Sequence, residues 1–145
     1  KVEMPLKFYE DFDVFKIFPL DVGLLGAMAD VPASKLLVGD NCFTEFKGAF
    51  TECYVNEQLA RIQIPTYYFS GNDTEIEIDF AVQTENRVIP IEVKSEESVR
   101  SKSLKTYIDK NPSLKGLRVS MKNHIDQGWM ENIGLYAIEG YLRKS

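Results

Sequence analysis

The fold is decided by Glu75-Ile-Glu-Ile-Asp-Phe-Ala-Val82 and by Val88-Ile-Pro-Ile-Glu-Val-Lys94, which follows it after a short polar segment. Apolar and polar residues alternate in both runs, a period that is typical of strands with one buried face. The connecting residues 83–87 are turn-like and short enough for a hairpin. The sequence therefore predicts two adjacent strands joined by a tight turn.

Both runs carry charged side chains. Alternation predicts one face of the first run with Ile76, Ile78, Phe80 and Val82, and an opposite face with Glu75, Glu77 and Asp79. In the second run the apolar residues Ile89, Ile91 and Val93 oppose Glu92 and Lys94. We expect the hairpin to bring Asp79 close to Glu92 and Lys94 on the same sheet face. Two carboxylates and an amine can hold a hard divalent cation and still leave one cation near a phosphate.

This arrangement resembles the PD-(D/E)XK nuclease superfamily, whose motif is an acidic residue on one strand and E-x-K on the next. The matching residues here are Asp79 and Glu92-Val-Lys94. The resemblance implies that Asp79, Glu92 and the carbonyl of Val93 ligate Mg²⁺ or Mn²⁺. Lys94 would then sit beside the attacking water, where it orients the water, lowers its pKa together with the metal, or neutralises charge in the transition state.

The motif lies within a longer order of segments. That order begins with Val14-Phe-Lys-Ile-Phe-Pro-Leu-Asp-Val-Gly-Leu-Leu25 and continues with Gly48-Ala-Phe-Thr-Glu-Cys-Tyr-Val-Asn-Glu-Gln-Leu59, Tyr67-Tyr-Phe69 and the two runs above. It is similar to the C-terminal domain of unknown function carried by many predicted AAA-type ATPases of bacteria and archaea. The resemblance runs from about Phe15 to the end of the chain. It implies a restriction-endonuclease-like domain attached to an ATPase.

A helix is predicted from residue 41 or 44 to about residue 62. One apolar stripe carries Phe46, Phe50, Cys53 and Ala60, and another carries Val55, Leu59 and Ile62. Glu57 falls within the first stripe, where a carboxylate needs a metal or a charged partner. The resemblance implies a helix-borne catalytic acid, for which we favour Glu57, with Glu52 on the other flank as the alternative. Pairing of Glu57 with a lysine or a backbone amide would serve structure alone.

The remaining segments complete an α/β fold. We expect an edge strand at residues 15–20, a helix at 25–29 capped by Asp21 and broken at 32–34, and a strand at 66–69 followed by a turn at 71–73. A helix at 98–110 should bury Leu104, Tyr107 and Ile108, before a strand at 117–121 and a last strand, or strand and helix, at 133–142. This order predicts a restriction-endonuclease-like αβββαβ core with a mixed central sheet flanked by helices.

Length and composition agree with a single domain at residues 1–145. With 145 residues, of which 44% are hydrophobic, the chain is long and apolar enough to bury its own core. We expect residues 1–40 to form an N-terminal extension and 41–145 the nuclease-like core, the whole being a C-terminal fragment of the longer ATPase. The chain begins with Lys1 and has no signal peptide or spanning apolar run. We therefore expect a cytoplasmic protein with no membrane partner.

Several other polar residues receive structural interpretations. Cys42 and Cys53 lack C-x-x-C spacing, and Cys53 is predicted to be a reduced core thiol. Ser95 and Ser98 are better suited to capping a helix than to catalysis. His124, the single histidine, lies in a loop-like segment and is not expected to be catalytic.

The net charge of −5 excludes a surface that is basic throughout, but basic residues gather in the second half. They are Lys94, Lys102, Lys105, Lys110, Lys115, Arg118 and Lys122. They could neutralise backbone phosphates beside the carboxylates, although a solvated helix face explains any single lysine more simply.

Three hypotheses follow from the sequence. The first is a metal-dependent nuclease that acts on DNA in preference to RNA. The second is a catalytically silent module that regulates the attached ATPase, since this chain has no phosphate-binding G-x-x-x-x-G-K-[ST] loop of its own. In the third, Lys94 pairs with Glu92 or Asp79 and only stabilises the hairpin.

Overall fold

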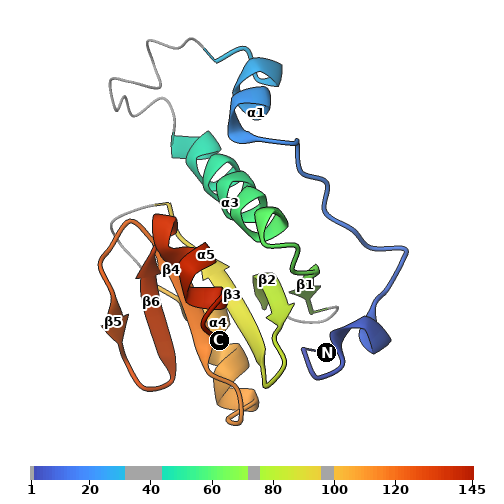
Figure 1. The fold of residues 1–145 in the computed structure, drawn as a ribbon, viewed down its shortest axis with the longest axis vertical. Helices are drawn as coiled ribbons and strands as arrows, with labels where there is room; N and C mark the ends of the chain where they lie inside the picture. Colours follow the sequence, from blue (N-terminus) through green and yellow to red (C-terminus); the bar gives the residue numbers. More distant parts are fainter. Residues whose placement is uncertain (1, 32–43, 72–75, 96–99) are drawn as a thin grey trace.

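A computed structural model describes residues 2–31, 44–71, 76–95 and 100–145 (Figure 1). Its described strands form one six-stranded sheet in the order β1-β2-β3-β4-β6-β5. The strands are β1 (Thr66–Ser70), β2 (Glu77–Gln83), β3 (Val88–Val93), β4 (Gly116–Ser120), β5 (Ile125–Asp126) and β6 (Met130–Gly134). β3, β4 and β6 run parallel to one another, while the β1–β2, β2–β3 and β5–β6 pairs are antiparallel. The predicted mixed sheet is thus confirmed.

Helices cover both faces of the sheet (Figure 1). α3 (Thr44–Arg61) and α5 (Ile138–Leu142) pack on one face, where Val55, Leu59, Ile138 and Leu142 join the apolar side chains of β2, β3 and β4. α4 (Lys102–Lys110) packs on the other face and buries Leu104, Tyr107 and Ile108 as predicted. Burying both faces accounts for the nearly complete burial of β3 and β4. The mixed α/β class follows directly, because each helix covers one apolar sheet face.

The hairpin forms as predicted, but β2 does not alternate regularly. Tyr67 pairs with Ala81 and Phe69 pairs with Ile78, so β2 has one extra residue opposite Tyr68. This is a β-bulge. It places Ile78 in the α4-side core, whereas Phe80 and Val82 lie in the α3-side core. The expectation that Ile78 shares a face with Phe80 and Val82 was therefore wrong, because a strict period of two cannot survive an inserted residue.

The N-terminal part differs most from expectation. Residues 15–20 are described and belong to no strand; they run outside the sheet as part of an extended segment, residues 10–20, here called the N-terminal strap (Figure 1). It connects η1 (Leu6–Tyr9) to α1 (Val22–Met28), whose cap is confirmed, since the amide of Leu24 donates to Asp21 Oδ1 over 2.7 Å. The short apolar run at residues 15–20 suggested an edge strand, but β1 takes the edge position instead.

Several boundaries also moved. α4 begins at Lys102 rather than near residue 98, β6 begins at Met130, and the short β5 was not predicted. Phe46 is exposed and so is Ala60, so the first predicted stripe of α3 is buried only in part. The predictions for residues 32–34, Cys42, Ser98 and most of the turn at 71–73 fall outside the described residues. None of the helices described is long and apolar enough to cross a membrane.

Candidate functional site

A pocket of about 450 Å³ lies where β2 and β3 separate. It is lined by Gly48, Glu52, Asp79, Val93, Lys94, Ser95 and Arg100, and we call it the strand-end pocket. The regular β2–β3 pairing reaches Phe80 and Ile91. Beyond that point the Asp79 carboxylate, not a backbone carbonyl, accepts the Val93 amide over 2.7 Å. The pocket therefore brings α3, β2 and the end of β3 together.

Asp79 is the most perturbed acid of the pocket. Burial raises its pKa from 3.8 to about 6, against the lowering effect of the Val93 amide. The negative charges of Glu52 and Glu92 raise that pKa further, while the ammonium of Lys16 lowers it. A carboxylate whose pKa is raised in this way is stabilised by a bound cation, because the cation favours the ionised form.

Glu92 and Lys94 form an ion pair at the end of β3, with 2.9 Å between Lys94 Nζ and Glu92 Oε1. Glu92 is only 4% exposed, and its other oxygen, Oε2, has no hydrogen-bond partner among the described residues. Leaving a buried carboxylate oxygen unpaired costs about 1–3 kcal/mol or more, so such an atom calls for a ligand. Arg118, the register neighbour of Glu92 on β4, interacts with Glu92 electrostatically and donates hydrogen bonds to Asn132 and Ser101.

The two carboxylates approach the pocket from different sides. Ile91 and Val93 lie in the α3-side core, so alternation turns Glu92 toward α4. Asp79, at the bulge, instead interacts electrostatically with Glu52 of α3 and Lys16 of the N-terminal strap. The expectation of one shared sheet face thus fails at the bulge. Their charges still interact, since Glu92 raises the pKa of Asp79, and Lys94 links Glu92 to the pocket lining.

The structure brings Glu52, not Glu57, to the strand-end pocket. Glu57 pairs with Arg61 one turn along α3, with 2.8 Å between Arg61 Nη2 and Glu57 Oε1. This is the structural pairing weighed for Glu57 from the sequence, with arginine in place of lysine. Glu52 lines the pocket and pairs with Lys16, whose Nζ lies 3.5 Å from Glu52 Oε2. The sequence favoured Glu57 because it lies in an apolar stripe. Periodicity alone does not show which flank of α3 faces β2.

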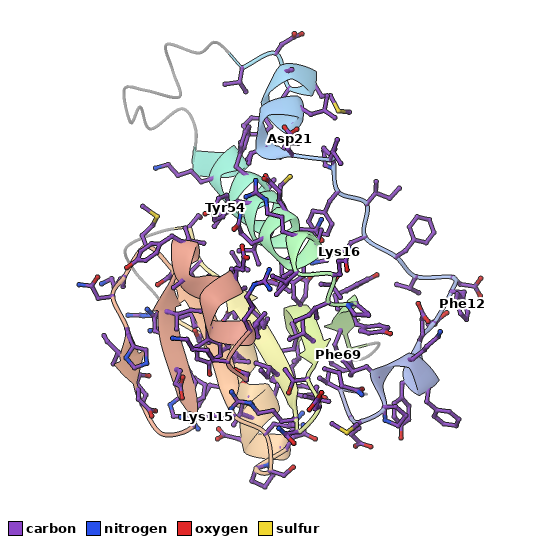
Figure 2. The ribbon with its side chains drawn as sticks, in the orientation of Figure 1. Phe12, Lys16, Asp21, Tyr54, Phe69 and Lys115 are labelled. Atoms are coloured by element: carbon purple, nitrogen blue, oxygen red, sulfur yellow. The ribbon has the colours of Figure 1, made fainter. Side chains whose placement is uncertain are left out.

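Lys16 was not anticipated as part of the site. Its ammonium also lies 3.2 Å from Glu77 Oε1 and 5.2 Å from the centre of the Tyr68 ring. Burial lowers the pKa of Lys16, but the charges of Glu52, Glu77 and Asp79 outweigh this effect and raise it. Figure 2 shows Lys16 on the part of the strap that returns toward α3. No sequence signal links it to the site, because a strap has no periodicity that fixes its contacts.

The other polar candidates divide into residues that line the pocket and residues that lie elsewhere. Ser95 and Arg100 line the pocket, and Ser101 rather than Ser95 occupies the N-cap position of α4. His124 is exposed, and Cys53 is a buried free thiol, as expected.

The basic residues of the second half do not form one stripe. Lys105 pairs with Asp109 on α4, and Lys115 pairs with both Asp126 and Glu131. Arg118 is buried. Of the predicted set, Lys94 is the residue that lines the strand-end pocket.

The described residues contain no group of three or more His, Cys, Asp or Glu side chains that could hold a metal ion. Mg²⁺ does not need such a group, since it keeps several waters and commonly binds through one or two carboxylates plus substrate oxygens. Asp79 lines the pocket and fits such an open site, whereas Glu92, with its unpaired Oε2, lies outside the pocket lining and interacts with Asp79 electrostatically.

Residues 47–137 match a family described as "Domain of unknown function (DUF4143)". Neither a curated protein nor a solved structure matches the chain.

Proposed function

We propose, for a chain that belongs to the DUF4143 family of unknown function, that the strand-end pocket hydrolyses phosphodiesters with Mg²⁺ or Mn²⁺. We further propose that the chain is a PD-(D/E)XK-type domain attached to an AAA-type ATPase and that it acts on DNA in preference to RNA. The order α3-β1-β2-β3-α4-β4 agrees with the core expected for that superfamily. The observation that carries the proposal is the buried Glu92 Oε2, which lacks a partner beside an acid that favours a cation.

The proposal assigns roles to the acids at and next to the pocket. Asp79, which lines the pocket, would hold the ion together with Glu92, which adjoins the lining residues Val93 and Lys94, and the Val93 carbonyl would be a further oxygen. Glu52 takes the place of Glu57 as the helix-borne acid. When bound, the ion polarises the phosphate and lowers the pKa of a water. The Val93 amide orients Asp79 by donating to Oδ2, which leaves Oδ1 for the ion.

Lys94 supplies the positive charge for catalysis. Its ion pair with Glu92 fixes the ammonium at the pocket wall, where it orients the attacking water and neutralises charge on the phosphate. Such a group commonly lowers the barrier by about 3–4 kcal/mol, or roughly 10²- to 10³-fold in rate. Arg100 and Ser95 line the same pocket and can contact phosphate oxygens.

The test combines binding and activity. Thermal denaturation should show that Mn²⁺ stabilises the wild type by mass action but stabilises Glu92→Gln much less. Nicking of supercoiled DNA in Mn²⁺ should fall by about 10²-fold or more in Lys94→Ala, with the fold retained. Glu85→Gln, on the exposed hairpin turn, is the matched control and should behave as wild type. Activity that survives in a Glu92→Gln, Lys94→Ala double variant would refute the proposal.

One observation favours the regulatory module as a second candidate. The ion pair between Lys94 and Glu92 gives each of these charges a partner without a metal or a substrate. A full-length protein that is inert on duplex, branched and single-stranded substrates, but whose ATPase rate changes when residues 41–145 are deleted, would establish this function instead.

A further inference from the structure

The sheet has an open edge at β1. Among the described strands, β1 pairs only with β2, so its outer side presents unpaired N–H and C=O groups at every second residue. Proteins usually cover or charge such an edge. The residues of β1 are Thr-Tyr-Tyr-Phe-Ser, with no charge and no proline. The edge is therefore competent to pair with another strand.

A groove of about 930 Å³ lies between β1 and the N-terminal strap, and we call it the edge groove. Thr66, Tyr68 and Ser70 line it from β1, and Glu10, Phe12 and Phe15 line it from the strap. The strap is held on both sides of the groove. Before it, the Leu6 amide donates to Gln83 Oε1 over 2.8 Å; at its other end, Lys16 binds Glu52 and Glu77.

The N-terminal strap exposes several large apolar side chains to solvent. Phe12 is 81% exposed, Phe15 69% and Ile17 82%. Figure 2 shows Phe12 at the outer bend of the strap, away from the sheet. Contiguous exposed aromatic and aliphatic side chains mark interaction sites on soluble proteins.

The edge groove is also negatively charged. Glu10 and Asp11 line it, and Asp13 follows on the same strap. Lys16, the basic residue of residues 10–20, is already bound to two glutamates. The negative charge of Glu10 also acts on β1. The pKa of Tyr67 is raised, mainly by burial and then by the charge of Glu10. A ligand of the groove should therefore carry positive charge.

We propose that the edge groove binds an extended segment of a partner protein that adds a strand to β1, with apolar residues alternating with lysine or arginine. Its backbone would form hydrogen bonds with the open edge of β1, its apolar side chains would pack on Phe12 and Phe15, and its cations would face Glu10 and Asp11, all of which line the groove. A second copy of this chain fits less well. Pairing two β1 edges would set two acidic straps side by side in a chain of net charge −5. The edge groove shares Asp79 with the strand-end pocket, but the inference rests on the β1 edge and the acids of the strap, not on a bound metal.

The experiment uses the full chain and a fluorescein-labelled peptide of alternating lysine and valine, followed by fluorescence anisotropy. We expect binding at least about tenfold tighter than that of the glutamate–valine analogue, because the groove is acidic. Methylating every second backbone nitrogen on the pairing side should abolish binding. Amide hydrogen exchange should slow in β1 when the peptide is bound.

Charge reversal supplies the matched variants. Glu10→Lys with Asp11→Lys should invert the preference between the two peptides. Glu85→Lys with Asp109→Lys changes net charge equally at exposed sites outside the groove and should leave the preference unchanged. If Glu10→Lys with Asp11→Lys fails to fold, the comparison of the two peptides on the wild type decides whether the inference holds.

Three results would overturn the inference. They are equal binding of the two peptides, binding that survives backbone methylation, and β1 amides that stay unprotected when the peptide is bound. Self-association through β1, seen as concentration-dependent sedimentation that protects the same amides, would assign the groove to a second copy instead.

Discussion

Replacing Asp79 by asparagine should stabilise the metal-free protein at neutral and alkaline pH. Asparagine keeps an oxygen that can accept the Val93 amide but carries no charge. In the folded protein the ionised Asp79 is penalised, because burial is the main cause that raises its pKa to about 6. In the unfolded chain the same carboxyl ionises at its ordinary pKa, near 4.

The size of the gain follows from the two pKa values. A rise from 3.8 to about 6 corresponds to about 3 kcal/mol, at about 1.4 kcal/mol per pKa unit. The weaker hydrogen bond from the Val93 amide to a neutral acceptor is already included in this difference, because that bond is one of the causes that set the pKa. We therefore expect Asp79→Asn to raise the free energy of unfolding by about 3 kcal/mol above roughly pH 7. For 145 residues this is about 6–12 °C in Tm.

The pH dependence has a definite sign. Because the folded pKa of Asp79 is raised, the folded state binds more protons than the unfolded chain between roughly pH 4 and pH 6. The contribution of Asp79 to stability is therefore most favourable below this window and is lost as pH rises through it. The advantage of Asp79→Asn should accordingly vanish near pH 4.

The assay is urea denaturation of metal-free protein in chelator, at several pH values across this window. Asp13→Asn, an exposed strap acid, is the control and should change stability by less than about 0.5 kcal/mol. A loss of stability in Asp79→Asn at alkaline pH, or a gain of equal size near pH 4, would refute the electrostatic reasoning. It would also remove one support of the metal site.

Two further outcomes follow from the structure. Lys16→Met removes the ammonium that pairs with Glu52 and lowers the pKa of Asp79, so calorimetric titration should show Mn²⁺ binding about fivefold tighter, from about 1 kcal/mol of relieved repulsion. Unchanged or weaker binding would contradict this. Gly116→Ala should cost about 1–3 kcal/mol in urea denaturation, because its new methyl group would lie 3.0 Å from the fully buried Leu104. The matched control Gly134→Ala should destabilise the protein much less. Its methyl group would lie 2.7 Å from Tyr136, but that exposed ring can turn into solvent. Equal losses of stability in the two variants would show that packing against Leu104 is not the cause.

The elements that the sequence determined are those with strong local patterns. The β2–β3 hairpin follows from a period of two around a short polar turn, and the buried face of α4 follows from helical spacing. The candidate acids and Lys94 were also identified from the sequence, because charged residues inside strands stand out against an apolar pattern.

Tertiary structure alone decided how those residues meet. The bulge opposite Tyr68 moved Asp79 off the face expected for it, and the rotation of α3 selected Glu52 over Glu57. The contact of Lys16 with Glu52 joins segments far apart in the chain. Local periodicity sets which face of an element is apolar, but register, helix rotation and the path of a strap depend on packing between distant segments, and no short stretch of sequence specifies that packing.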